Sequence, residues 1–302
     1  MKKVVTYLLA AILIIGSVLF SESSRVMADD AEDYSADSKW IKDYEYYLRS
    51  NTGEIVLTKY KGTDTDVFVY RKAKVGGRTY KTVLSTHDGL SIWAKTDVVR
   101  IDFEDGFEFP ENCAYLFYYC IKLKSIDLRG VDTSKAVTME GMFESCYSLK
   151  VLDLSSFNTK NVRNMDDMFC GDDNLLNIDV SSFDTRNVTT ADRMFASCNH
   201  LKRLDLSNFD LRNLKTTSHS DIFAAAFYGA ICDGTFEYIY TPINVNASVD
   251  LDYNFYDIKC NKCRYIPKNN KTTKKLYSKM VGWEKIERDN GTPLYRYSPF
   301  DN

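Results

Sequence analysis

The sequence predicts an α+β solenoid in which each coil contributes one short helix and one strand. Two observations support this fold class: an apolar motif returns at a fixed spacing of 26 residues, and each copy combines a helical spacing with a strand-like alternation. The motif Leu-Asp-Leu-Ser-Ser-Phe at residues 152–157 returns as Ile-Asp-Val-Ser-Ser-Phe at 178–183 and as Leu-Asp-Leu-Ser-Asn-Phe at 204–209. Weaker copies precede these, so about five coils are expected in residues 101–223.

The helix and the strand of each coil follow from two different periods. Four apolar residues of one copy fall at i, i+3, i+6 and i+7, on one face of a short helix: Val162, Met165, Met168 and Phe169. The next apolar residues indicate a strand: Leu175, Ile178 and Val180. One coil cannot bury its own apolar edge, and this period with an L-x-x-L-x-L pattern is typical of leucine-rich repeats, so the coils are expected to stack. Stacking predicts a structural ladder with one phenylalanine per coil: Phe117, Phe143, Phe169 and Phe195.

Residues 1–28 are predicted to be a signal peptide. Lys2 and Lys3 precede an apolar run from Val4 to Phe20, and Val26-Met27-Ala28 supplies small residues at the cleavage positions. An uncleaved membrane anchor is the alternative, since the apolar run of a signal peptide is usually shorter. The prediction places the mature protein outside the cell, either secreted or on the cell surface.

Three further segments surround the repeats. Residues 29–43 are acidic and polar, and we expect a flexible leader there. Residues 44–100 contain alternating apolar runs with a hairpin signal at Gly76-Gly77, which predicts a β-rich N-terminal cap. Residues 224–302 are expected to form a small C-terminal cap and a basic tail.

Composition and charge narrow the range of partners. The chain is 44% hydrophobic with a formal net charge of −3, which is typical of a globular protein and gives no indication of nucleic-acid binding. Most lysines of the tail are expected to be solvated. The alternative is contact with an anionic cell wall or membrane through five of them: Lys268, Lys271, Lys274, Lys275 and Lys279.

No motif for catalysis or for a cofactor occurs in the sequence. The three histidines, His87, His200 and His219, stand in unrelated contexts, and H-E-x-x-H, G-x-S-x-G and phosphate-binding glycine motifs are absent. The sequence therefore predicts a non-enzyme with no cofactor and no bound metal. Because carboxylates are abundant enough to form a glycosidase-type pair, a secreted hydrolase is the least favoured alternative.

The cysteines indicate structural positions. Cys120, Cys146 and Cys198 each stand three residues after a ladder phenylalanine, where small buried side chains are expected, whereas the third copy has Asp172. Free buried thiols are predicted there, since bridge geometry is demanding. Cys260 and Cys263 have the spacing of a local disulfide in the cap, with half of a zinc site as the alternative.

The strand register predicts a column of aspartates on the face that stacking leaves exposed: Asp102, Asp127, Asp153, Asp179 and Asp205. Arg100, Arg129 and Arg203 flank this column. Neighbouring strands lie about 4.8 Å apart, so these like charges should repel one another. Two compensations are open: hydrogen bonds from adjacent Ser, Thr or backbone N–H groups, or binding of a basic partner or divalent cations.

The motif from 152 to 169, Leu-Asp-Leu-Ser-Ser-Phe-Asn-Thr-Lys-Asn-Val-Arg-Asn-Met-Asp-Asp-Met-Phe, closely resembles the 26-residue repeat of bacterial surface proteins, the BspA-like class of leucine-rich repeats. The resemblance implies an exported, non-catalytic protein that binds other proteins in adhesion. The chain departs from that pattern in having few repeats and no wall-sorting motif near residue 302. A structural cell-wall component held by the basic tail is the alternative function.

Overall fold

The computed structural model describes residues 37–86, 89–201, 203–206 and 208–215, together with five short strands between residues 238 and 297. The predicted signal peptide, Cys260, Cys263 and the lysines of the tail lie outside the described residues. No helix in the described ranges has the length and apolar character needed to cross a membrane. Of the expected flexible leader, only residues 37–43 are described, and Lys39–Asp43 form a 3-10 helix, η1.

A four-stranded sheet follows η1. Its strands are β1 (Tyr44–Arg49), β2 (Glu54–Tyr60), β4 (Lys72–Val75) and β5 (Arg78–Leu84), in the order β1-β2-β5-β4. β1 and β2 are antiparallel, whereas β2 and β5 are parallel. The hairpin predicted at Gly76-Gly77 joins β4 to β5, and both glycines have the positive φ that a two-residue turn requires, 56° and 76°.

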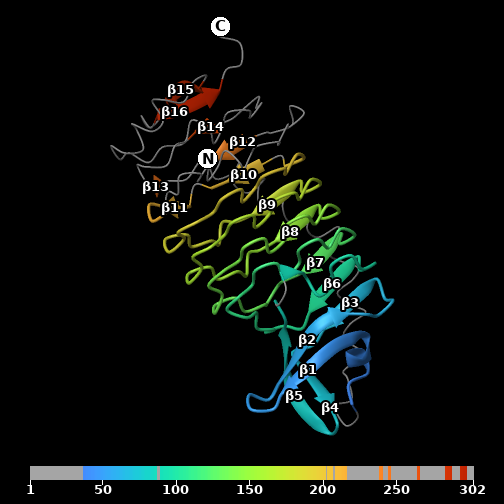
Figure 1. Cartoon of the computed structure of the whole chain (residues 1–302). Helices are drawn as coiled ribbons and strands as arrows, with labels where there is room; N and C mark the ends of the chain where they lie inside the picture. The colour runs from blue at the N-terminus through green and yellow to red at the C-terminus, as the bar shows by residue number, and fades with distance from the viewer. Residues whose placement is uncertain are drawn as a thin grey trace, which may run out of the picture. The chain divides into compact units, whose positions relative to one another are not determined.

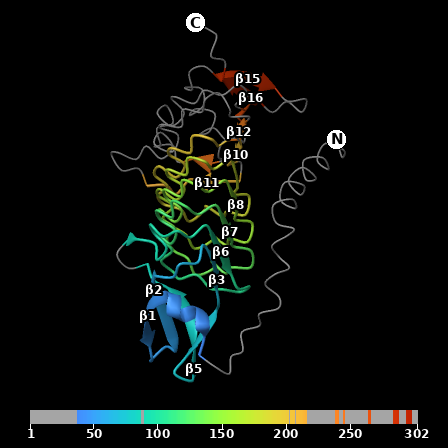
Figure 2. The same cartoon turned by 90° about the vertical axis from the view of Figure 1, so that its right-hand side faces the viewer.

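The repeats form a solenoid of about five turns with parallel strands (Figure 1). One strand per turn follows the predicted period: β6 (Arg100–Phe103), β7 (Ser125–Asp127), β8 (Val151–Asp153), β9 (Asn177–Asp179) and β10 (Arg203–Asp205). β3 (Asp66–Val69), which the sequence placed in the cap, pairs in parallel with β6 and extends this row. Each turn leaves its strand, passes through loops and returns to the next strand, as the view in Figure 2 shows.

Short strands follow the repeats. β12 (Tyr238–Tyr240) adds in parallel to β10, giving the order β12-β10-β9-β8, and β11 (Asp210–Leu211) pairs with β13 (Asn244–Val245). The last three strands form an antiparallel sheet in the order β14-β16-β15: β14 (Arg264–Tyr265), β15 (Trp283–Glu287) and β16 (Pro293–Tyr297).

The core of the solenoid contains aromatic ladders. The phenylalanines at 117, 143, 169 and 195 are each at most 1% exposed, and successive rings stack with centroids 5.2, 5.9 and 5.3 Å apart. Trp93 adds a stacked ring to the first of them at 5.7 Å, a contribution from outside the repeat that the period does not reveal. A second ladder joins Phe157, Phe183 and Phe209. Offset stacking and burial of large rings make these ladders a main source of cohesion between coils.

The short helix predicted in each coil is wrong. Among the described residues there is no α-helix, and residues 166–170 form turns. Asp167 and Gly171 have φ of 55° and 77°, in the left-handed region that interrupts a right-handed helix. The N–H groups of Met165 and Phe169 donate to carbonyls of the next coil, both at 2.9 Å, instead of to their own segment. Stacking therefore takes the hydrogen bonds that a helix would use.

The cysteine positions are small buried slots between coils. Cys120, Cys146 and Cys198 are free and buried, and the Sγ atoms of the last two donate to the carbonyls of Phe117 and Phe169, both at 3.1 Å. Asp172 occupies the same slot in the third coil with no exposure to solvent. Its Oδ1 accepts the N–H of Cys146 at 2.8 Å, and its Oδ2 has no hydrogen-bond partner in the described part of the chain.

Candidate functional site

The strand row brings the predicted aspartates together on one face. Asp102 lies opposite Asp127 in the β6–β7 ladder, and Asp153 lies opposite Asp179 in the β8–β9 ladder. β10 continues the row, since Arg203 pairs with Asn177 of β9. The central residue of β8 and of β10 is buried while the residues beside it are at least partly exposed, so these aspartates point away from the core.

The first two aspartates are neutralised by arginines. Asp102 is 7% exposed, and Arg100 Nε lies 2.8 Å from its Oδ2; burial raises the pKa of Asp102 despite this ion pair. Arg129 makes a bidentate contact with Asp127, with Nε to Oδ1 at 2.9 Å and Nη2 to Oδ2 at 2.5 Å. Burial acts to raise the pKa of Asp127, but the hydrogen bonds from Arg129 outweigh it, and the pKa is lowered. Neither carboxylate is available as a free charge.

The next two aspartates accept a backbone hydrogen bond but meet no arginine in the same position. Asp153 Oδ1 accepts the N–H of Ser155 at 3.0 Å, and Asp179 Oδ1 accepts the N–H of Ser181 at 2.9 Å. This turn, in which a carboxylate caps the N–H two residues on, closes the strand and partly compensates the charge. The hydrogen-bonding compensation considered from the sequence is therefore present at both positions.

Exposure increases along the row. The two aspartates of β7 and β8 are half-buried, whereas Asp179 of β9 and Asp205 of β10 are exposed. We call Asp153 and Asp179, whose carboxylates accept the N–H of the serine two residues on, the acidic strand patch. Adjacent carboxylates on neighbouring strands repel, so this patch is suited to attract a cationic group from outside.

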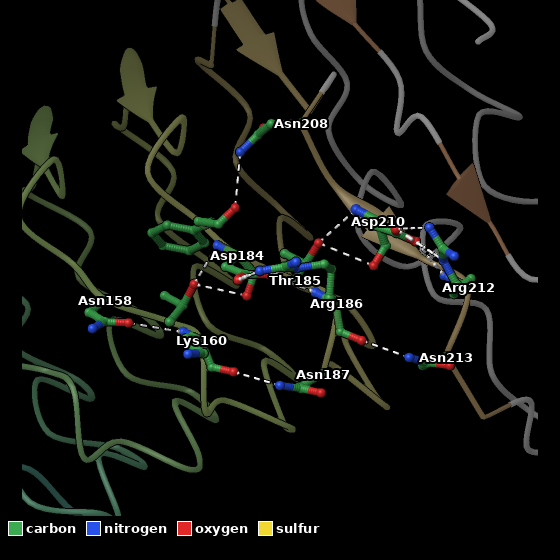
Figure 3. Close-up of polar contacts among 12 residues, drawn as sticks. Asn158, Lys160, Asp184, Thr185, Arg186, Asn187, Asn208, Asp210, Arg212 and Asn213 are labelled. Atoms are coloured by element: carbon green, nitrogen blue, oxygen red, sulfur yellow. Dashed lines mark hydrogen bonds and ion pairs between the residues drawn. The ribbon is translucent and has the colours of Figure 1, made fainter.

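Two other aspartates of the same coils, Asp184 and Asp210, are neutralised by arginines within the chain (Figure 3). We call the loops that carry them the second rim of the coils. Asp184 and Asp210 each accept the N–H of the residue two positions on, and that residue is an arginine whose guanidinium folds back onto the carboxylate. Arg186 Nη2 lies 2.5 Å from Asp184 Oδ2, and Arg212 makes the equivalent contact with Asp210. The hydrogen bonds from Arg186 lower the pKa of Asp184. The residue two positions after the aspartate therefore decides whether the carboxylate is neutralised: an arginine there forms an ion pair with it, whereas a serine offers only its backbone N–H.

Sequence reasoning missed that signal, although it is visible in the printed chain. Asp127-Leu-Arg129 has the neutralising arrangement, whereas Asp153-Leu-Ser155 and Asp179-Val-Ser181 have a serine in place of the arginine. No three His, Cys, Asp or Glu side chains in the described ranges gather so that they could hold a metal ion.

The other residues singled out from the sequence do not join this site. The phenylalanine ladder is internal. His200 is exposed and contacts the carbonyl of Asp173 through Nδ1 at 2.7 Å, while His87 and His219 lie outside the described residues.

Comparison with known proteins gives a partial family match. Residues 111–231 match the model of a family described as a Mycoplasma protein of unknown function, DUF285. No curated protein matches the chain. A leucine-rich repeat protein of T. pallidum is 15% identical, with 67% of this chain and 70% of that chain covered and a TM-score of 0.29.

Two further solved structures are similar. A leucine-rich repeat protein from Bacteroides ovatus is 14% identical, with 72% of this chain and 56% of that chain covered and a TM-score of 0.37. A leucine-rich cell surface protein from Faecalibacterium prausnitzii is 13% identical, with 78% of this chain and 95% of that chain covered and a TM-score of 0.22.

Proposed function

We propose that this chain is an exported binding protein whose acidic strand patch docks a basic surface of another protein. The observation that carries the proposal is the serine at the second position after Asp153 and Asp179, where Asp127 has an arginine. The carboxylates are held in place by backbone hydrogen bonds, yet their charge is not neutralised in the way that Arg129 neutralises Asp127. Export rests on the basic start, the apolar run and the small residues of positions 1–28.

The expected interaction is electrostatic and directional. Lysine or arginine side chains of a partner would relieve the repulsion between carboxylates on adjacent strands, and arginine can bind a carboxylate through two parallel hydrogen bonds. Because these carboxylates are at least partly exposed, salt should weaken the interaction, chiefly by slowing association. The solenoid supplies the surface, because stacked repeats present side chains of successive strands at regular intervals.

The test removes charge without removing the turn. Asp153→Asn together with Asp179→Asn keeps an Oδ1 that accepts the N–H of the following serine, so the strand ends stay intact. Binding is measured by biolayer interferometry against a panel of purified extracellular proteins that ranges from acidic to basic. We expect the wild type to bind basic members with salt-sensitive affinity and the double variant to weaken that binding by about tenfold or more.

A matched control changes the same net charge elsewhere. Asp132→Asn together with Asp184→Asn also removes two carboxylates that accept the N–H two residues on, but at the other rim of the coils. This control should retain wild-type affinity. Equal affinity of both double variants, or a wild type with no preference for basic proteins, would show that the patch does not bind such a partner.

A further inference from the structure

β1 is an edge strand with apolar side chains exposed on both faces. It stands at one end of the sheet order β1-β2-β5-β4, and five of its six residues are exposed. Six large apolar side chains are exposed in the described residues, and three belong to β1: Tyr46 at 38%, Tyr47 at 45% and Leu48 at 41%. An exposed apolar edge of this kind is a template for pairing with another strand.

Within the described residues, the backbone groups of Tyr46 and Leu48 face the open side of this edge. The carbonyl of Arg49 accepts the N–H of Gly53 at 2.9 Å across the turn into β2, so Arg49 faces β2. Backbone direction alternates along an antiparallel pair, so Tyr47 also faces β2, while Tyr46 and Leu48 direct their N–H and C=O groups to the open side. Among the described strands, β2 is the only neighbour of β1 in its sheet.

The side chains of β1 are complementary to a second copy of themselves. Tyr44 has the same alternation but is buried, so three antiparallel registers are open to a partner β1: Tyr46 opposite Leu48, or either of these residues opposite itself. When Tyr46 lies opposite Leu48, Tyr47 lies opposite Tyr47 and Glu45 lies opposite Arg49. Within the strand, this is the one register of the three that joins opposite charges at both ends.

We propose that β1 pairs with β1 of a second copy of this chain in this register, forming a two-fold antiparallel dimer. Four main-chain hydrogen bonds between Tyr46 and Leu48 and two Glu45–Arg49 pairs define the interface. Within one chain these charges contact Lys59 at 3.9 Å and Glu54 at 3.2 Å, with the side chains of Glu45 and Arg49 about half exposed. Such exposed pairs contribute little, so sharing the charges across the interface costs little.

The first test blocks the open edge and leaves β2 pairing intact. Leu48→Pro removes an N–H that faces away from β2, and proline is tolerated on an edge strand in that position. Sedimentation velocity is recorded on the purified full chain from micromolar to about 100 micromolar, with circular dichroism as the measure of folding. The wild type should show a concentration-dependent dimer, and folded Leu48→Pro should be monomeric.

A charge swap keeps the proposal testable if the proline variant does not fold. Glu45→Arg and Arg49→Glu singly place like charges opposite each other and should raise the dimer dissociation constant about tenfold. The double variant restores opposite charges and should recover the dimer. Three results would overturn the proposal: a wild type that stays monomeric, a folded Leu48→Pro variant that dimerises, or a double swap that fails to recover the dimer.

Discussion

Replacing Asp172 with cysteine should stabilise this protein, because the third coil places a carboxyl where the neighbouring coils have thiols. Asp172 is completely buried, and its Oδ2 has no hydrogen-bond partner in the described residues. An unsatisfied buried polar atom costs about 1–3 kcal/mol. A cysteine at 172 can donate to the Phe143 carbonyl, as Cys146 and Cys198 donate to the carbonyls of their preceding coils.

The substitution leaves no backbone group orphaned. The N–H of Cys146, which now donates to Asp172 Oδ1 at 2.8 Å, also donates to the carbonyl of Phe143 at 3.2 Å. We therefore expect Asp172→Cys to raise the free energy of unfolding at pH 5 by about 1–3 kcal/mol. Urea denaturation monitored by circular dichroism, under reducing conditions, measures this difference.

The stabilisation should grow with pH. Burial raises the pKa of Asp172 well above its usual range, so the folded state keeps a proton that the unfolded chain releases above about pH 4. The contribution of Asp172 to the free energy of unfolding of the wild type therefore falls as pH rises from about 4 toward the pKa of Asp172 in the folded state. Between pH 5 and pH 7 the advantage of the cysteine variant should increase by up to about 3 kcal/mol.

Asp172→Asn provides the control, because it removes the titration while it retains a polar side chain in the slot. It should show the same gain with pH as the cysteine variant but a smaller gain at pH 5. A cysteine variant that is less stable than the wild type, or a difference that does not change with pH, would refute the reasoning that Asp172 is a buried, protonated acid.

Two further predictions concern the turns that replace the expected helix. Gly141→Ala should destabilise the protein more than Gly171→Ala. Both glycines have a positive φ, which costs alanine about 1–3 kcal/mol. A Cβ at 141 would also collide with the Tyr115 ring, 2.6 Å from its Cδ1, whereas the atom nearest to a Cβ at 171 is 3.2 Å away. Equal melting temperatures for the two variants would contradict this difference. Glu144→Gln should flatten the dependence of stability on pH, since burial and the nearby charge of Asp167 raise the pKa of Glu144 to about 7, and the wild type therefore loses stability as pH rises from about 4.5 to 7. Denaturation curves at pH 4.5, 6 and 7.5 measure this slope, and parallel curves for the two proteins would count against it.

The helix error shows what the period could and could not determine. The spacing of Met165 and Met168 correctly indicates burial, and both side chains are fully buried. The same spacing is compatible with successive turns, and the choice depends on whether backbone N–H groups find partners within the segment or in the next coil. Left-handed residues recur at the same places of each coil, and several are not glycine, such as Asp167 and Ser145, so composition gave no warning.

For the acidic column too, the sequence predicted the positions of the aspartates but not their contacts. The register of the strands could be predicted from the repeat, because alternation along a strand fixes which side chains leave the core. Whether a carboxylate in that column stays charged and open depends on its contacts. Arg129 forms an ion pair with Asp127, whereas Asp153 accepts the N–H of Ser155.

The sequence alone determined the period of the coils, the strand in each of them, the buried apolar positions and the column of aspartates, because all of these depend on spacing along one chain. The tertiary structure decided which backbone groups pair between coils, that Trp93 extends the aromatic ladder, that Asp172 is completely buried, and that β1 is the edge strand of its sheet among the described strands. These depend on hydrogen-bond competition and on contacts between distant segments. Such contacts are set by the packing of the whole chain and leave no periodic trace in the sequence.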